Sequence, residues 1–319
     1  MIGTNYNGSM IISASRRTDL PALYAPWFLR RVREGWCSVP NPFNLRQVKR
    51  ISLRPEKVDA LVFWSRWPAP LLPALAELRH RGLGRSLFLI TLLHYPRILE
   101  PRQPPLQKRL QAFRDLAGQV GTERTVWRYD PILLTPATPP IWHVQTFTRL
   151  ARALKGHTKR CIVSFMDDYA KIRPRMERLY CHGFGPPPLK QGTRRRAELL
   201  ARLVEIARNH GIALQTCAQE ADLVGGLVPA GACIDADLLH RLFGTPRPAG
   251  ADPNQRENCL CAPSQDIGMY DSCTFGCAYC YATHHFRRSR ANRAAHDPDS
   301  PSLLGHHIPA PAQAVLPGC

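Results

Sequence analysis

Residues 60–92 read ALVFWSRWPAPLLPALAELRHRGLGRSLFLITL and contain one strand–helix–strand unit. Ala60–Ser65 and Ser86–Leu92 are short runs of branched and aromatic side chains, which are typical of strands buried on both faces of a sheet. Between them, Pro70–Arg81 has a helical pattern, and Gly82 follows where a helix C-terminus favours glycine. The stretch therefore predicts two parallel strands joined by a helix that crosses over the sheet.

The same alternation occurs six times along the chain of 319 residues. The other expected strands are Met10–Ser15, Arg124–Tyr129, Cys161–Phe165 and Ile212–Thr216, and the other expected helices are Ala22–Arg33, Pro105–Ala117, Pro140–Leu154, Arg194–Asn209 and Ala236–Phe243. An extended pair near Ser38–Pro42 and Val48–Leu53 decorates the first crossover. The pattern predicts an α/β fold of six βα units, a partial TIM-like barrel of parallel strands. Periodicity leaves an open doubly wound sheet as the alternative.

Composition divides the chain into three parts. We expect the partial barrel over residues 1–243, a cysteine-rich segment that binds a metal cluster over 244–283, and a weakly structured tail over 284–319. No apolar run reaches the ~20 residues that a membrane span needs, and no signal peptide is recognisable, so we expect a cytoplasmic protein without membrane contact.

Eleven cysteines and a formal charge of +19 also bear on function. In a reducing compartment, that many cysteines indicate metal binding or catalysis more than disulfides. The charge comes mainly from arginine, and it favours a polyanion such as nucleic acid as substrate or partner. Solvated helix faces rich in arginine are the alternative.

Polar side chains follow the expected strands at their carboxyl ends, which meet at one edge of a parallel sheet. A ring of charged groups there indicates a pocket for a small polar substrate or cofactor. The ring consists of Ser15, Arg16, Arg17, Asp19, Ser65, Arg66, His94, Tyr95, Arg128, Tyr129, Asp130, Asp167, Asp168, Tyr169, Gln215, Thr216, Cys217 and Glu220.

Roles in this ring follow from side-chain chemistry. The guanidinium groups of Arg16, Arg17 and Arg128 suit carboxylate or phosphate. The carboxylates of Asp130, Asp167 and Asp168 suit hydroxyl groups or proton transfer. Cys217 is a possible hydrogen-atom donor or nucleophile, and Ser15 and Gln215 are expected to contact a cofactor. Asp19 precedes Leu-Pro and is equally well explained as a helix cap.

Residues 273–282, CTFGCAYCYA, place Cys273, Cys277 and Cys280 in the spacing C-x3-C-x2-C. Three thiolates suit a soft metal site. As ligands of a four-iron cluster they leave one iron open to an external ligand. A zinc knuckle with Cys261, His284 or His285 as fourth ligand is the alternative.

This spacing, with the aromatic Tyr279 before the last cysteine, resembles the signature of radical S-adenosylmethionine (SAM) enzymes. The resemblance implies a [4Fe-4S] cluster on the three cysteines, SAM as cofactor with Tyr279 beside its adenine, and an external electron donor of the flavodoxin or ferredoxin type. In most such enzymes the cysteine loop follows the first strand, whereas here it follows the sixth helix. A linker of about 15 residues can span about 50 Å, enough for the loop to return to the strand ends.

The whole chain resembles a family of uncharacterised bacterial proteins, a domain of unknown function noted for a C-terminal cysteine cluster similar to that of radical SAM enzymes. The resemblance covers about residues 10–305. It includes SASRRTDLPALY at 13–24, VWRYDPILLTP at 126–136 and DIGMYDSCTFGCAYCYA at 266–282. No activity is implied by the family.

Four further cysteines lie within family-like segments: Cys217, Cys233, Cys259 and Cys261. They are candidates for a second metal site, either an auxiliary iron–sulfur cluster or zinc. The alternative is that they are small buried apolar side chains.

The leading hypothesis is therefore a radical SAM-type iron–sulfur enzyme acting on a small molecule or a nucleic acid. The alternative is a metal-stabilised protein, with iron–sulfur or zinc, that binds or modifies nucleic acid. A zinc hydrolase would suit the aspartates at the strand ends, but no H-x-H follows the first strand.

Overall fold

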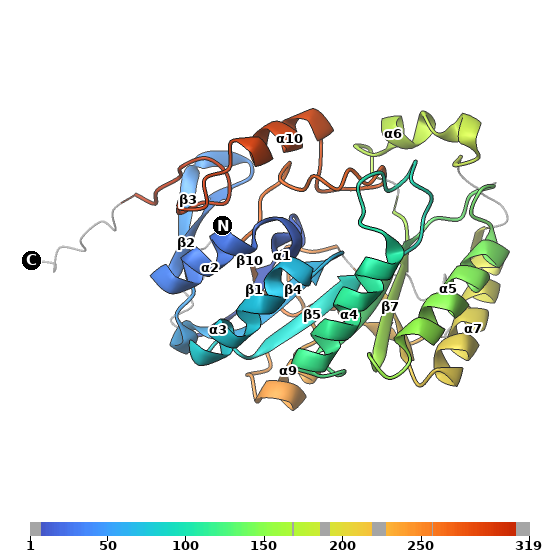
Figure 1. Ribbon diagram of the computed structural model, residues 1–319, viewed down its shortest axis with the longest axis horizontal. Helices are drawn as coiled ribbons and strands as arrows, with labels where there is room; N and C mark the ends of the chain where they lie inside the picture. The colour runs from blue at the N-terminus through green and yellow to red at the C-terminus, as the bar shows by residue number, and fades with distance from the viewer. Residues whose placement is uncertain (1–7, 168, 186–191, 219–227, 257, 311–319) are drawn as a thin grey trace, which may run out of the picture.

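The computed structural model describes residues 8–167, 169–185, 192–218, 228–256 and 258–310. Its centre is a sheet of eight parallel strands in the order β10-β1-β4-β5-β6-β7-β8-β9 (Figure 1). The strands are β1 Met10–Ala14, β4 Val58–Ser65, β5 Ser86–Thr91, β6 Thr125–Ile132, β7 Arg160–Phe165, β8 Ala213–Cys217, β9 Ala230–Gly231 and β10 Gln265–Asp266. Strands β2 Trp36–Asn41 and β3 Asn44–Ser52 form a separate antiparallel hairpin, as predicted.

The described helices follow the strands and match the six expected ones closely. They are α1 Leu20–Leu23, α2 Ala25–Glu34, α3 Leu75–His80, α4 Leu106–Val120, α5 Pro140–Leu154, α6 Arg173–Glu177, α7 Gly192–Asn209, α9 Ala236–Phe243 and α10 Phe286–Ala294, with short 3-10 helices η1 Pro55–Lys57, η2 Ala69–Ala74 and η3 Tyr180–His182. None of the helices within the described ranges is long and apolar enough to cross a membrane.

The prediction of six βα units needs correction, because the sheet has eight strands. The six expected strands are all present, from β1 to β8 in chain order. The two additional strands, β9 and β10, contain two residues each, and so short a segment has no periodic pattern that could reveal it.

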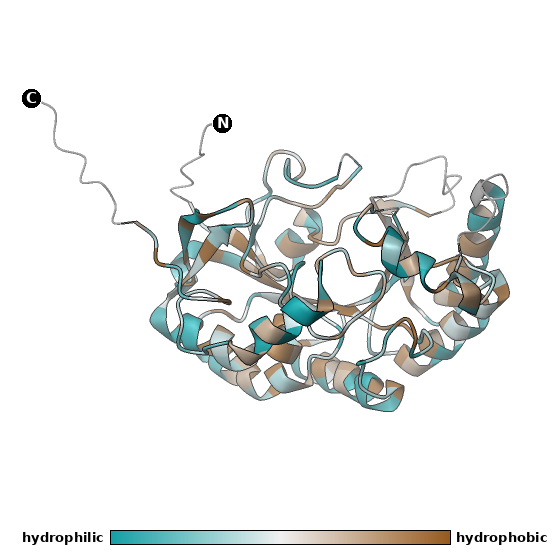
Figure 2. Cartoon of the chain, turned by 90° about the horizontal axis from the view of Figure 1, so that it is seen from above, coloured by the Kyte–Doolittle hydropathy of each residue, from teal (hydrophilic) through white to brown (hydrophobic). Residues whose placement is uncertain are grey.

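The strand order favours a partial barrel over a doubly wound sheet. From β1 to β9 the order in space follows the order in the chain. Right-handed crossovers in one direction leave the connecting helices on one face, whereas a doubly wound sheet reverses its strand order. Most of the helices lie along one side of the molecule (Figure 2), whereas α9 packs against the other face of the sheet. The end strands β10 and β9 each pair with one described neighbour, so the barrel stays open.

Both faces of the sheet are buried, which explains the continuous apolar runs. Phe63 points toward the helices, where it stacks on Phe88 at 4.9 Å and meets Phe28 edge-on. Its neighbours Val62 and Trp64 belong to the opposite, inner core, together with Leu239 of α9. Described residues between Ala232 and Ala262 thus cover the inner face that the crossover helices leave open.

Where composition predicted a weak tail from residue 284, the structure has helix α10 and a packed segment behind it. The indole Nε1 of Trp27 donates to the Ser300 carbonyl oxygen at 2.9 Å, and Ser38 N donates to that of Pro301 at 2.8 Å. Leu303 is almost fully buried. Hydrogen-bond partners far away in the chain therefore hold this segment in place, which local composition does not predict. Residues 311–319 lie outside the described part.

Candidate functional site

The short strand β10 places the cysteine loop at the carboxyl end of the sheet. It pairs with β1, with Ser13 opposite Asp266. The Asp266 carboxylate accepts hydrogen bonds from Ser13 Oγ (2.9 Å), Ser15 Oγ (2.6 Å), Arg16 N (2.7 Å) and Gly268 N (2.9 Å). Sequence reasoning missed Asp266, and its position just before the loop was the available signal. Ser15, which was expected to contact a cofactor, donates the hydrogen bond of its hydroxyl to this carboxylate.

The loop then packs across the ends of β1, β4 and β5. The Tyr279 hydroxyl donates to Glu100 and accepts from Arg66 Nη2 at 2.9 Å. Arg66 Nη1 also contacts Glu100 Oε1 at 2.6 Å. Ala278 N donates to the Leu99 carbonyl oxygen at 2.9 Å. Tyr279 is therefore held inward, with its hydroxyl already bonded and its ring beside Tyr95 at 5.8 Å.

The three thiols of the loop lie close enough to influence one another electrostatically. Burial raises the pKa of Cys277 to about 12, although Arg66 acts in the opposite direction. Burial also raises the pKa of Cys273, with Cys280 and Asp19 adding to the effect. Gln103 Nε2 lies 3.6 Å from Cys277 Sγ. The thiols of Cys273 and Cys277 therefore stay protonated without a metal, and a metal would have to displace their protons.

The surroundings of the loop contain unpaired donors and acceptors. Arg175 Nε and Nη1 are buried donors without a hydrogen-bond partner among the described residues, and they suit an anionic group, whereas Glu100 Oε2 and Gln103 Oε1 are buried acceptors without one. A buried unpaired polar atom costs roughly 1–3 kcal/mol. Arg66 and Arg175 also lie near the thiols, where their charges oppose that of thiolates. As the side chains stand, no group of three or more His, Cys, Asp or Glu within the described ranges is arranged to hold a metal ion, so ligation requires side-chain rotation.

Part of the predicted ring gathers on the inner face of the sheet. The guanidinium groups of Arg16 and Arg128 lie 5.4 and 4.7 Å from the Trp64 ring. Arg128 pairs with Asp130, which also accepts from Ser164. Arg16 and Arg128, two of the three arginines expected to bind anions, therefore both lie beside the Trp64 ring.

The other predicted residues lie with different partners. Arg16 Nη1 also contacts Ser264 Oγ at 3.1 Å and Asp252 at 3.8 Å. Arg17 lies over the Tyr270 ring at 5.1 Å, and Asp167 pairs with Arg256. Asp168 and Glu220 fall outside the described residues.

Two further predicted residues lie on β8. Gln215 Oε1 is buried and has no hydrogen-bond partner among the described residues. A Cβ atom on Gly231 would lie 2.9 Å from that oxygen, so Gln215 packs directly against strand β9. Cys217 at the end of β8 is buried and contacts Cys233. Gln215 and Cys217 therefore both pack against the segment around β9.

Tyr281 joins the cysteine loop to the inner arginines. It follows Cys280, and its hydroxyl donates to the Arg16 carbonyl oxygen at 2.8 Å. Its ring lies 5.8 Å from that of Tyr169. Through Tyr281 the cysteine loop therefore adjoins the inner part of the ring.

Asp19 is a helix cap. It precedes α1 and accepts from Ala22 N at 3.1 Å. It also accepts from Ser65 Oγ at 2.7 Å and Arg66 N at 2.6 Å. Burial raises its pKa to about 6 despite these hydrogen bonds. The Asp19 carboxyl thus links the end of β4 to the start of α1 through hydrogen bonds.

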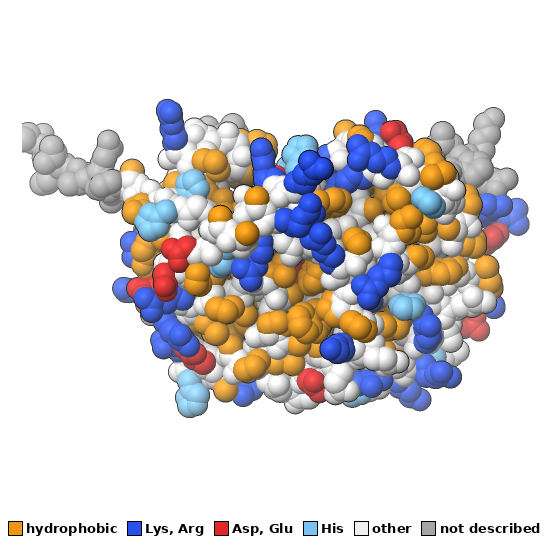
Figure 3. Space-filling model, turned by 45° about the horizontal axis from the view of Figure 1, so that its top comes forward, with side chains coloured by type: hydrophobic (Ala, Val, Ile, Leu, Met, Phe, Trp, Pro, Cys, Tyr) orange, Lys and Arg blue, Asp and Glu red, His pale blue; other side chains and the backbone are white. Residues whose placement is uncertain are grey.

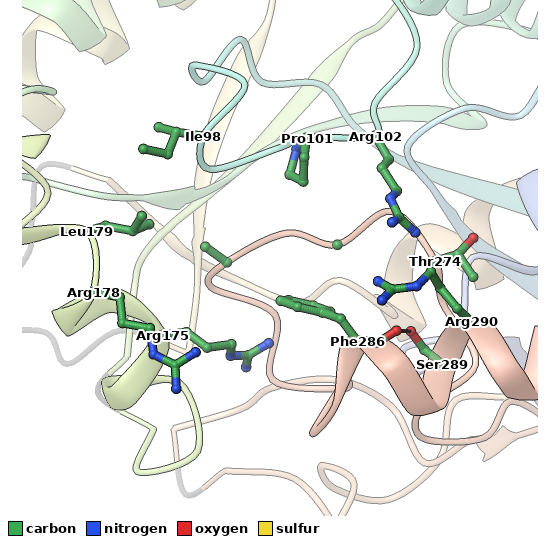
Figure 4. A pocket seen from close by; sticks show the side chains of 12 residues that line it. Ile98, Pro101, Arg102, Arg175, Arg178, Leu179, Thr274, Phe286, Ser289 and Arg290 are labelled. Carbon is green, nitrogen blue, oxygen red and sulfur yellow. Dashed lines mark hydrogen bonds between the residues drawn. The ribbon is translucent and has the colours of Figure 1, made fainter.

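The outer side of the cysteine loop borders a hollow of about 290 Å³. Its wall includes Thr274, Gly276 and Ala278 of the loop. Basic side chains spread over this face, with acidic ones mainly at its margins (Figure 3). Four arginines line the hollow, namely Arg102, Arg175, Arg178 and Arg290 (Figure 4). No acidic side chain of the described chain lines this hollow, so it suits an anion.

Comparison with known proteins identifies the family. The family model of a domain of unknown function, DUF1848, matches residues 11–282. The chain therefore belongs to this family, as its sequence motifs predicted. No curated protein matches the chain.

Two solved structures show weak similarity. One is pyruvate carboxylase from Rhizobium etli with the allosteric activator acetyl coenzyme A, at 13% identity and a TM-score of 0.24, covering 76% of this chain and 23% of that one. The other is the carboxyl transferase domain of the same enzyme with 3-hydroxypyruvate, at 13% identity and a TM-score of 0.24, covering 76% and 44%. This chain spans less than half the length of either, and a likeness this weak bears on neither fold nor function.

Proposed function

We propose that this protein is a radical SAM-type iron–sulfur enzyme. The observation that carries the proposal is the position of the C-x3-C-x2-C loop. It leaves β10 and packs over the ends of neighbouring parallel strands, among buried polar atoms that lack partners within the described residues.

The order of strands in space supports this proposal. The radical SAM resemblance leads one to expect the cysteine loop after the first strand. Here the loop comes late in the chain, but it follows β10, which is the edge strand next to β1. The loop is thus attached to the first strand in space, and the unusual position in the sequence amounts to a permuted connection.

In this proposal Cys273, Cys277 and Cys280 hold a [4Fe-4S] cluster, which supplies an open iron for SAM and the electron for its reductive cleavage. Gln103 supplies an N–H group to the Cys277 sulfur. The positive charges of Arg66 and Arg175 partly neutralise the negative charge of the thiolate ligands. Such hydrogen bonds and charges around thiolates tune a cluster's potential.

The inner arginines are the proposed substrate contacts. Arg128 is paired with Asp130, and Arg16 with Asp252. A carboxylate or phosphate on the substrate would compete with these two aspartates, because guanidinium binds all of them in the same way. Tyr281 lies between Arg16 and the cysteine loop, where it would separate substrate from cluster.

The test is anaerobic reconstitution with iron and sulfide, followed by electron paramagnetic resonance with and without SAM. We expect a reduced-cluster signal that SAM perturbs, and 5′-deoxyadenosine when dithionite or a flavodoxin-type donor supplies electrons. Cys277→Ala should lose both, whereas Cys181→Ala, an exposed free thiol, should lose neither. A fully loaded cluster that SAM leaves unperturbed would contradict the proposal.

A second candidate function rests on the arginine hollow. Four guanidinium groups beside the loop favour a polyanion, and the formal charge of +19 points the same way. The corresponding function is a metal-stabilised protein that binds or modifies nucleic acid. It requires binding of DNA or RNA that weakens steeply with salt, and absence of binding at low salt would exclude it.

A further inference from the structure

Four cysteines outside the triplet converge on the inner face of the sheet. Cys217 ends β8, Cys233 lies between β9 and α9, and Cys259 and Cys261 lie between α9 and β10. All four are less than a tenth exposed. The sulfur atoms of Cys217 and Cys233 are 3.3 Å apart. All four side chains belong to one buried cluster, and Cys261 lies near enough to the other three thiols to interact with them electrostatically.

The surroundings of this cluster favour bound thiolates. Ile234 N donates to Cys261 Sγ at 3.4 Å, and the positive charge of Arg16 lies near enough to interact with Cys261. Arg128 is close enough to Cys233 to act on its charge. Arg16 Nη2 and Arg128 Nε are buried without a partner among the described residues. Four thiolates around a divalent ion carry a net charge of about −2, which the guanidinium groups of Arg16 and Arg128 offset in part, because Asp252 and Asp130 also pair with them.

We infer that Cys217, Cys233, Cys259 and Cys261 form a second metal site that binds a single zinc ion through four thiolates. The distance of 3.3 Å between the sulfurs of Cys217 and Cys233 favours a single metal ion as the bound group. A disulfide needs about 2.05 Å between sulfurs, whereas a tetrahedral site with Zn–S bonds of about 2.3 Å needs about 3.8 Å. A four-iron cluster separates its thiolates much further, because a cube of iron and sulfide stands between them.

The side chains are not yet arranged as ligands, so each thiol rotates about its Cα–Cβ bond when the ion binds. The rotation is small for Cys217 and Cys233, whose sulfurs are already within about half an ångström of the tetrahedral spacing. The ion would link three parts of the chain: β8, the start of α9, and the segment that contains Cys259 and Cys261. The site is structural, because four protein ligands leave no open position.

The test uses the full chain with Cys273, Cys277 and Cys280 all changed to alanine, so that the proposed iron–sulfur site is absent. Purified after expression with iron and zinc, it should contain about one zinc per chain and no iron–sulfur absorption. Adding Cys261→Ser should remove the zinc. Adding Cys37→Ser instead, which alters an equally buried thiol outside the cluster, should leave it.

A second measurement covers variants that fail to fold. A strong chelator should lower the unfolding temperature of the chain with four intact cysteines, and added zinc should restore it. A folded chain without metal, iron and sulfide at this site, or a Cys217–Cys233 disulfide found by mass spectrometry after alkylation would each overturn the inference. These results do not depend on the cysteine triplet, so they are separate from the test of SAM chemistry.

Discussion

Ser15 donates a hydrogen bond of 2.6 Å to Asp266 across 251 positions of sequence. This contact joins the end of β1 to the two-residue strand β10, and the cysteine loop begins directly after it. The Asp266 carboxylate and the donors around it therefore fix the start of the loop beside β1.

Replacing Asp266 with alanine should destabilise the protein by about 2–4 kcal/mol, because several buried donors lose their acceptor at once. Iron incorporation should fall as well, since the loop loses its anchor to β1. Denaturant unfolding and iron analysis measure the two effects. Asp237→Ala, at an exposed ion pair, should change stability by about 0.5 kcal/mol or less. Equal effects of the two variants would contradict this account.

Gly268 lies tightly against Ser15 and Thr18, which follow β1. A Cβ atom there would lie 2.0 Å from Ser15 Oγ and 2.8 Å from Thr18 Oγ1. Gly268→Ala should therefore cost about 1–3 kcal/mol through overpacking. Gly118→Ala, in helix α4 with nothing within 4 Å, should instead stabilise by about 0.5–1 kcal/mol. Thermal unfolding of both variants checks the opposite signs.

His143 should make stability depend on pH. It is fully buried, its Nδ1 meets the Tyr129 hydroxyl and its Nε2 the Leu133 carbonyl oxygen, both at 2.9 Å. Burial lowers its pKa from 6.5 to about 4. Between these values the unfolded chain binds more protons, so the contribution is present above about pH 6.5 and is lost as pH falls toward 4.

Wild type should thus lose up to about 3 kcal/mol more than His143→Gln when pH falls from 6.5 to 4. Asp19 acts in the opposite sense, because its raised pKa of about 6 gives stability that is lost as pH rises. Both proteins contain Asp19, so its effect cancels in the difference. Denaturant titrations at several pH values measure that difference, and parallel curves would show that His143 does not titrate as expected.

The arginine hollow allows a matched test of nucleic-acid binding. If it binds phosphates, Arg178→Ala with Arg290→Ala should reduce the salt slope of binding by about 1 for each phosphate that is no longer neutralised. Arg152→Ala with Arg208→Ala removes the same charge from the exposed surfaces of α5 and α7 and should leave the slope nearly unchanged. An equal reduction in both pairs would indicate a non-specific charge effect.

The amino-acid sequence alone predicts the six long strands of the partial barrel and the spacing of Cys273, Cys277 and Cys280. Both are local signals: strands buried on two faces need continuous apolar runs, and ligands in one loop need fixed spacing. The three-dimensional arrangement was needed to place β10 beside β1 and to reveal Asp266 as the anchor of the loop. It was also needed to bring cysteines from three separate segments together on the inner face. Two-residue strands and contacts across hundreds of positions leave no periodic pattern in the chain, because they form only when the remaining surfaces of the barrel are covered.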